Sequence, residues 1–347
     1  MAHPHPERHC LITGGAGFIG SHLAEVLLRE GCWVTVVDNL STGRQSNLNQ
    51  MMRHPRFRFV KLDVANRELM APLVSRSTEV YHLASYVGVR LANLPSSRHI
   101  LNNLHAIDTI LDLVAHYRPK FLLTSSSEVY GNALSHGAQD GIAELYEDGD
   151  RVYGATNIHR WSYAGIKAVE EFLTLGKHHE EGIHAVIIRP FNVVGPRQIG
   201  RTGMVLPRFI DQALRHDPIT VYGDGSQMRC FTYIDDVIHA IQLLMQEPKA
   251  SGQIFNVGNT EPISVKALAE KIITMTKSQS VIEYIPIEKV YGKQFEDVQI
   301  RIPNVDKLAR YTGFRPGTPL ETLLTETIAE TDYHHARIRR TAREVDS

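Results

Sequence analysis

The feature that most constrains the fold is a glycine-rich segment that directly follows a short apolar run. The run His9–Thr13 leads into the sequence TGGAGFIG, and helical spacing of apolar residues begins near Phe18. Glycines at such a strand-to-helix turn let the backbone bend sharply and approach a pyrophosphate closely. The N-terminus of the helix then offers unpaired N–H groups and the positive end of its dipole. The segment therefore predicts a dinucleotide site, and the alternative is a glycine-rich turn that holds no ligand.

Strand-like and helix-like segments alternate through the first half of the chain. Strands are predicted at His9–Thr13, Trp33–Val37, Phe57–Leu62, Val80–Ala84, Phe121–Ser125 and Ala185–Arg189. Helices are predicted at Phe18–Glu30, Ile100–His116 and Trp161–Leu175. This β-α-β alternation predicts an α/β fold, a doubly wound (Rossmann) parallel sheet with helices on both faces.

The length of 347 residues favours two lobes, because single cores stop growing at roughly 250–300 residues. After Pro190 the alternation gives way to loops rich in Gly and Pro, and Phe231–Val257 is expected to return to the sheet. We predict a dinucleotide-binding domain from 8–191 plus 230–257 and a smaller C-terminal substrate lobe from 192–229 plus 258–335. The charged residues 336–347 are expected to be a frayed helix or disordered.

Composition excludes several classes of function. A formal net charge of −1 argues against a nucleic-acid binder, which needs a positive field. No run of apolar residues is long enough for a membrane helix or a signal peptide. Three scattered cysteines favour a reducing cytoplasm over a disulfide framework. The adjacent pairs His178-His179 and His334-His335 lack the spacing of metal ligands on one helix face, so no metal site is predicted.

Asp38 ends the second predicted strand, where a carboxylate accepts hydrogen bonds from the ribose hydroxyls of a dinucleotide. The same charge would repel a 2′-phosphate, which favours NAD over NADP, although the nearby Arg44 leaves NADP open. Asp63 ends the next strand and is expected to meet the adenine.

Tyr163 and Lys167 are four residues apart on a predicted helix, so both side chains lie on one face. A phenol with a pKa near 10 is a poor base at neutral pH. An adjacent ammonium and the positive nicotinamide of NAD favour the phenolate, which can then remove a hydroxyl proton. A packed tyrosine beside a solvated lysine is the alternative interpretation of this spacing.

These features together resemble the extended short-chain dehydrogenase/reductases, specifically the nucleotide-sugar epimerases, dehydratases and decarboxylases. The resemblance covers nearly the whole chain. It rests on the glycine segment, the Tyr163–Lys167 pair and five further motifs: Asp38–Gly43, Tyr81–Ala84, Thr124–Gly131, Arg189–Arg197 and Val221–Tyr233.

The resemblance implies roles for individual residues. The expected NAD contacts are Gly14, Gly17, Phe18, Ile19, Gly20, Asp38, Asn39, Asp63, Val64, Leu83, Ala84 and Lys167. The expected contacts to a UDP-sugar are Arg90, Asn192, Arg208, Tyr222, Arg229 and Arg301. Asn192, Arg229 and Arg301 would bind the diphosphate, for which a guanidinium fork is well shaped, and Tyr222 would lie beside the nucleobase. A surface charge is the alternative for any one of these arginines.

The pair Ser127-Glu128 bears on the reaction, and both residues are predicted to be catalytic with Tyr163 and Lys167. In the family's simple 4-epimerases the second position is usually small, in its 4,6-dehydratases the pair is typically Asp-Glu, and in UDP-glucuronate decarboxylases it is Ser-Glu or Thr-Glu. Further similarity to the decarboxylases lies in Arg160-Trp161, Arg189–Asn192, Arg229–Thr232 and Tyr291–Val298. The loop Ser85–Arg90 departs from the xylose-forming type and looks more like that of some epimerases, which leaves the sugar open.

The sequence therefore predicts an NAD-dependent enzyme that oxidises C4 of a UDP-sugar, with UDP-glucuronate decarboxylation as the leading reaction. Glu128, or a water that it orients, would protonate C5, and the alternative for Glu128 is a structural carboxylate. The other candidates are a UDP-hexose or UDP-uronate 4-epimerase and a non-catalytic protein that senses NAD. The apolar stripe of Ile100, Leu104, Ile107, Leu111 and Val114, with the helix of Tyr163, resembles the four-helix interface of homodimers in this family, and a core role is its alternative.

Overall fold

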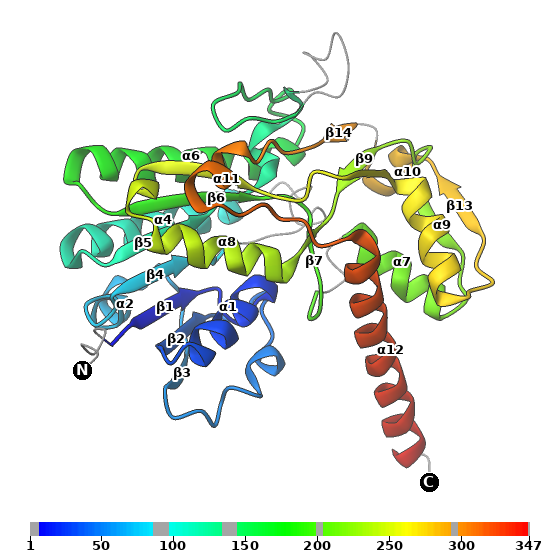
Figure 1. The fold of residues 1–347 in the computed structure, drawn as a ribbon, viewed down its shortest axis with the longest axis horizontal. Coiled ribbons are helices and arrows are strands. Elements are labelled where there is room, and N and C mark those ends of the chain that lie inside the picture. The colour runs from blue at the N-terminus through cyan, green and yellow to red at the C-terminus, as the bar shows by residue number, and fades with distance from the viewer. Residues whose placement is uncertain (1–6, 86–96, 134–143, 199–203, 293–297, 346–347) are drawn as a thin grey trace.

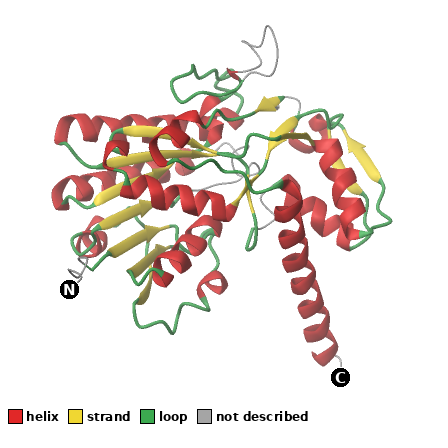
Figure 2. Cartoon of the chain, in the orientation of Figure 1, coloured by secondary structure: helices red, strands yellow, loops and turns green. Residues whose placement is uncertain are grey.

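Short runs of apolar residues form one seven-stranded parallel sheet in the computed structural model, which describes residues 7–85, 97–133, 144–198, 204–292 and 298–345 (Figures 1 and 2). The strand order is β11-β6-β5-β4-β1-β2-β3, and every neighbouring pair is parallel. The strands are β1 (His9–Thr13), β2 (Trp33–Asp38), β3 (Phe57–Lys61), β4 (Glu79–His82), β5 (Lys120–Thr124), β6 (Ala185–Pro190) and β11 (Gln253–Val257).

Helices cover both faces of this sheet because side chains alternate between the faces along each strand. On β1, Cys10 and Ile12 pack into one hydrophobic cluster and Leu11 into another. The first cluster draws on α1 (Phe18–Arg29) and α8 (Ile234–Gln246), and the second on α2 (Arg67–Val74) and α4 (Ser97–Tyr117). The doubly wound α/β fold is confirmed.

The smaller lobe consists of short elements around the carboxyl end of the sheet (Figure 1). β9 lies between β12 and β14, and β8 pairs with β13. The elements of this part are α7 (Val205–Leu214), β8 (Ile219–Tyr222), β9 (Met228–Cys230), β12 (Pro262–Ser264), α9 (Val265–Thr276), β13 (Ile282–Ile285), α10 (Ile287–Tyr291) and β14 (Ile300–Arg301). The chain returns to the main sheet through β11, as predicted for Phe231–Val257. The remaining short elements are η1 (Gln45–Leu48), η2 (Ser127–Tyr130), β7 (Val193–Val194), β10 (Thr232–Tyr233), η4 (Pro248–Ala250) and α11 (Asp306–Thr312).

One helix is longer than the sequence predicts, and another runs into the predicted tail, for which a frayed helix is one of the two expectations. α6 spans Arg160–Glu181 and passes its predicted end at Leu175. It stops at Gly182, whose φ of 67° is the left-handed conformation that commonly ends helices. α12 spans Leu320–Val345 and continues through the predicted tail boundary at residue 336 (Figure 1). Among the described residues, no helix is both long and apolar enough to span a membrane.

The stripe predicted to form a dimer interface lies mostly in the core. Ile107, Leu111 and Val114 on α4 are fully buried against the sheet, whereas Ile100 is partly exposed. For these three residues the interface interpretation is wrong, because the sheet already covers that face of α4. The exposed apolar residues near this stripe are Ile100 and Leu101 on α4 and Val169, Phe172 and Leu173 on the adjacent α6.

A buried ion pair fastens α6 to the sheet. Arg189 on β6 is fully buried, and its Nε and Nη2 atoms donate to the two carboxylate oxygens of Glu171 at 2.8 and 2.7 Å. Glu171 also accepts from Ser125 Oγ at 2.5 Å, and Arg189 donates to the hydroxyl of Tyr130 at 2.8 Å. A buried guanidinium is tolerated only when such partners satisfy it. The pair therefore joins α6, β6 and the end of β5 in one fixed arrangement.

We predict that Glu171→Gln lowers the free energy of unfolding by about 3 kcal/mol, because it leaves the charge of Arg189 buried without a counterion. The matched control is Glu181→Gln, which removes a partly exposed partner of Lys177 on the same helix and should cost less than about 1 kcal/mol. Urea unfolding followed by circular dichroism measures both. Equal effects of the two substitutions would contradict the importance of the buried pair.

Candidate active site

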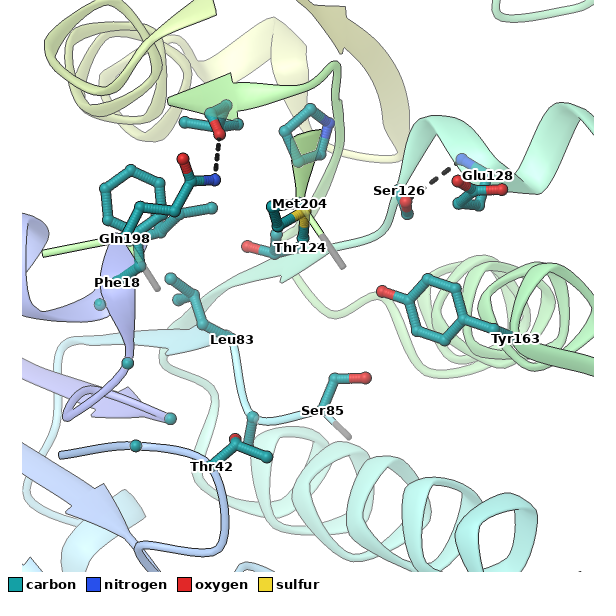
Figure 3. A pocket seen from close by; sticks show the side chains of 18 of the residues that line it. Phe18, Thr42, Leu83, Ser85, Thr124, Ser126, Glu128, Tyr163, Gln198 and Met204 are labelled. Atoms are coloured by element: carbon teal, nitrogen blue, oxygen red, sulfur yellow. Dashed lines mark hydrogen bonds between the residues drawn. The ribbon is translucent and has the colours of Figure 1, made fainter. Parts of the chain in front are cut away.

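A cavity of about 600 Å³ lies at the carboxyl ends of the parallel strands, where the sheet meets the smaller lobe (Figure 3). Its walls come from the turn after β1, the ends of β2, β4 and β5, the start of α6, and residues of the smaller lobe. The strand order reverses at β1, which lies between β4 and β2. Doubly wound sheets bind their ligands at such a switch point. All of the predicted NAD residues line this one cavity.

The glycine turn forms a floor that excludes side chains. Gly14 has a φ of 69°, and a Cβ there would lie 2.7 Å from the backbone nitrogen of Ala84. A Cβ on Gly20 would lie 2.6 Å from the carbonyl oxygen of Gly14. Gly17 caps α1 without any side-chain hydrogen bond, so the first N–H groups of the helix remain available to an anion. The turn fits a pyrophosphate against the helix N-terminus.

The far end of the cavity carries carboxylates suited to the adenosine half of NAD. Asp38 is buried and accepts hydrogen bonds from the backbone nitrogens of Ala16 at 3.0 Å and Leu40 at 2.8 Å. Burial raises the pKa of Asp38, and these two hydrogen bonds oppose that rise. Asp63 accepts from Asn39 Nδ2 at 3.1 Å. With Val64 and Leu83 also in the wall, these residues fit a ribose and the flat face of an adenine.

Tyr163 and Lys167 lie on the same face of α6, as their spacing predicts. Figure 3 shows the Tyr163 phenol pointing into the cavity. The Lys167 ammonium is buried, lies 6.0 Å from the centre of the Tyr163 ring, and donates to the carbonyl oxygen of Thr124 at 3.1 Å. Burial raises the pKa of Tyr163, and the charge of Lys167 opposes that rise. The surroundings of Tyr163 within the protein therefore favour a protonated phenol, beside a cation in a fixed position.

Glu128 forms an ion pair that the sequence does not predict. Arg301 donates to both of its carboxylate oxygens, at 2.6 and 3.1 Å, and Nη2 of Arg160 lies 3.6 Å from Oε2. Burial alone would raise the pKa of Glu128, but the charges of Arg301 and Arg160 outweigh it and bring this pKa to about 2. Glu128 is thus a carboxylate anion at any physiological pH. Arg301, expected at a diphosphate, lies beside this carboxylate.

Ser126 and Arg160 also belong to the site, although the sequence assigned a site role to neither of them. The Ser126 hydroxyl accepts from the backbone nitrogen of Glu128 at 3.1 Å and lowers the pKa of Tyr163 by hydrogen bonding (Figure 3). Ser127, the predicted catalytic serine, is buried in the same wall. Arg160 precedes Tyr163 by three residues on α6, so helical spacing alone could have identified it. No spacing rule distinguishes Ser126 from Ser127, because β5 ends at Thr124 and the alternation of side chains along the strand stops there.

The predicted nucleotide-sugar residues line the cavity from the side of the smaller lobe. The guanidinium of Arg208 lies 3.7 Å from the centre of the Tyr222 ring, and burial lowers the pKa of this arginine. Asn192 donates to the carbonyl oxygen of Cys230 at 2.8 Å, and Arg229 donates to that of Met228 at 2.9 Å. All four line the cavity together with Arg301. Arg90 lies outside the described residues.

Comparisons with known proteins agree with this geometry. The model of the NAD dependent epimerase/dehydratase family matches residues 10–258. The UDP-N-acetyl-alpha-D-glucosaminuronate decarboxylase of Bacillus cytotoxicus is 40% identical over 93% of this chain and 97% of its own length. UDP-glucuronic acid decarboxylase 1 of Danio rerio is 32% identical over 92% of this chain and 72% of its own. The UDP-glucuronic acid 4-epimerase of Bacillus cereus, solved with UDP-glucuronic acid and NAD, superimposes with a TM-score of 0.82 at 26% identity and covers 94% of this chain and 99% of its own.

We predict that Asp38→Ala weakens NAD binding roughly 10- to 100-fold, the effect of losing hydrogen bonds to a charged group. It should also reduce the preference for NAD over NADP, because the charge that repels a 2′-phosphate is gone. Fluorescence titration with both cofactors measures the ratio of affinities. Asp63→Ala is the control, since loss of an adenine contact should weaken both cofactors alike. Equal affinity of the unsubstituted protein for NAD and NADP would contradict this role of Asp38.

Proposed function

The chain belongs to the NAD dependent epimerase/dehydratase family, and we propose that it decarboxylates a UDP-linked uronic acid. The observation that carries the proposal is the convergence of Arg160 and Arg301 on Glu128 beside Tyr163. Both guanidiniums line the cavity together with Tyr163. A guanidinium recognises a carboxylate, such as C6 of a uronic acid, better than it recognises any group of a neutral hexose.

The reaction follows from the position of Tyr163. NAD, when bound on the glycine turn, supplies the reversible oxidation of the sugar C4. Tyr163, as phenolate beside Lys167, takes the proton of the C4 hydroxyl. Once C4 is a ketone, the C6 carboxylate belongs to a β-keto acid, and the C5–C6 bond breaks to release CO2. The bonding electrons enter an enolate, which must gain one proton at C5.

The ion pair of Glu128 bears on how that proton arrives. A carboxyl group with a pKa of about 2 does not carry a proton at neutral pH. Of the two routes expected from the sequence, direct donation by Glu128 is therefore disfavoured, and donation by a water that Glu128 orients is supported. Arg301 and Arg160 keep the carboxylate charged and its two oxygens in place.

The relatives bear on the sugar. The relative that is 40% identical is named for a UDP-N-acetylglucosaminuronate, and the relative that is 32% identical for UDP-glucuronic acid. Both names specify a UDP-linked uronic acid, and the two sugars differ at C2. We propose the C6 carboxylate as the required group, with Arg229 at the diphosphate and Tyr222, beneath the Arg208 guanidinium, at the uracil.

A UDP-uronate 4-epimerase is the second candidate. The structural likeness to the UDP-glucuronic acid 4-epimerase of Bacillus cereus favours it. Such an enzyme would use the same C4 oxidation but return the hydrogen to the opposite face of the sugar and keep all its carbons. A non-catalytic NAD-sensing protein is disfavoured because Tyr163, Lys167 and Glu128 all line one cavity.

We propose that the protein is a homodimer held by α4 and α6, which lie side by side (Figure 1). Val169, Phe172 and Leu173 are exposed on α6, and Ile100 and Leu101 are exposed on the neighbouring α4, and two copies of this helix pair would form a four-helix bundle. A cytoplasmic location is also proposed, and the free, buried state of Cys10, Cys32 and Cys230 supports it.

Phe172→Glu is predicted to convert the dimer to a monomer, because Phe172 is 69% exposed in the single chain and a charge in a bundle core is costly. Light scattering at micromolar concentration gives the mass of each variant. Val281→Glu, which changes an equally exposed apolar residue in the smaller lobe, should remain a dimer. A monomeric unsubstituted protein would refute the dimer.

The decarboxylase assignment predicts CO2 release from a UDP-uronic acid in the presence of NAD. UDP-glucuronate and UDP-N-acetylglucosaminuronate are each incubated in D2O and the product is read by NMR. The product should lack C6 and carry one solvent-derived deuteron at C5. Tyr163→Phe should lose roughly 10²- to 10⁴-fold in turnover while it still binds NAD. A product that retains its carbons and carries no deuterium at C5 would replace the decarboxylase with the epimerase.

A further inference from the structure

Lys167 has a buried carboxylate partner that none of the roles described so far requires. Glu170 lies one turn further along α6, and its Oε2 accepts from Lys167 Nζ at 2.8 Å. The two side chains are only 1% and 3% exposed. A glutamate is almost never buried so completely without a specific partner. The short contact is that of a carboxylate with an ammonium.

Glu170 is distinct from its neighbour Glu171. Glu171 binds Arg189 and Ser125, and that pair fastens α6 to the sheet. Glu170 makes its charged contact with Lys167 instead. Two consecutive glutamates on one helix therefore serve two different cations, and Glu170 can be changed without removing the partner of Arg189.

The ammonium of Lys167 is held by fixed acceptors. Of its three N–H donors, one reaches Glu170 and one the carbonyl oxygen of Thr124 at 3.1 Å. One donor is left, on an ammonium that lines the cavity. An ammonium held in this way keeps a constant position relative to the Tyr163 ring, 6.0 Å away.

The charges around this pair give Glu170 a second effect. On α6, Tyr163, Glu170 and Glu171 all act on Lys167, and from β4 the buried His82 faces it. Burial and the charge of Lys167 bring the pKa of His82 to about 3, so this ring is neutral. The positive charge of Lys167 lowers the pKa of Tyr163 and so favours its phenolate. The negative charges of Glu170 and Glu128 raise this pKa and disfavour the phenolate. Glu170 thus partly cancels the field of the lysine at the phenol.

We propose that Glu170 is a positioning residue that holds Lys167 and sets the pH range in which Tyr163 acts as a base. The inference deepens the proposed function, since it rests on Tyr163 being the base. The carboxylate of Glu170 has two opposing effects: it holds Lys167 in place, and its charge raises the pH at which the Tyr163 phenolate forms. Removal of that charge should favour the phenolate, while the charge of Glu171 still raises the pKa of Lys167.

The test is a titration of the Tyr163 phenol that needs no substrate. Tyrosinate absorbance near 295 nm is recorded against pH for the NAD-bound protein, and the curve of its Tyr163→Phe counterpart is subtracted. The same difference is taken in the Glu170→Gln background, which keeps the size and an acceptor but removes the charge. The Tyr163 pKa should fall by about one unit, a tenfold change in its ionisation. Glu181→Gln, on the same helix, should leave it unchanged.

A merely structural Glu170 would lower the amount of folded protein and leave the Tyr163 pKa in place, and that result would overturn the proposal. If Glu170→Gln does not fold, the titration is made on Glu170→Asp. Its carboxylate is one carbon further from Lys167, so the pKa should still fall, by less, and no shift would again overturn the proposal. The titration contains no sugar, so its outcome does not depend on the decarboxylation assay. If the protein decarboxylates no UDP-uronic acid, the proposed function is refuted and the result of the titration still stands.

Discussion

The bidentate pair between Arg189 and Glu171 is the interaction on which the rest of the site depends. It is buried, and it joins β6, which lies between β11 and β5 in the sheet, to the helix that carries Tyr163 and Lys167. Glu171 also accepts from Ser125, the residue before Ser126. One carboxylate therefore fixes two walls of the cavity, the helix with Tyr163 and the loop with Ser126. A shift of α6 would move Tyr163 away from the ends of the strands and from the glycine turn.

Charge is distributed along the cavity in a consistent order. Near the ends of β2 and β3, Asp38 and Asp63 are carboxylates that accept from N–H groups. Beside Tyr163, Arg160 and Arg301 contact Glu128, and Arg208 and Arg229 line the cavity from the smaller lobe. This polarity suits a cofactor whose ribose donates hydrogen bonds and a substrate that carries phosphates. The glycine turn between the two ends contributes only backbone N–H groups, which serve any anion.

Much of this arrangement could be predicted from the sequence, because it depends on local patterns. The apolar runs predicted where the strands lie along the chain, the glycine segment predicted one wall of the cavity, and the spacing of Tyr163 and Lys167 predicted their shared face. What could not be predicted depends on contacts between distant segments. Arg301 meets Glu128 across 173 positions of the chain, and the burial of Ile107 depends on where the sheet lies. The choice between Ser126 and Ser127 depends on the turn after β5, which no periodicity describes.

We propose that this cavity oxidises C4 of a UDP-linked uronic acid with Tyr163 as the base. Stopped-flow absorbance at 340 nm tests it most directly, with the NAD-bound protein mixed against UDP-uronic acid carrying hydrogen or deuterium at C4. The account predicts a transient rise in reduced cofactor that is slower for the deuterated sugar and is lost in Tyr163→Phe. Release of CO2 without any absorbance transient, or a transient of unchanged rate in Tyr163→Phe, would contradict it.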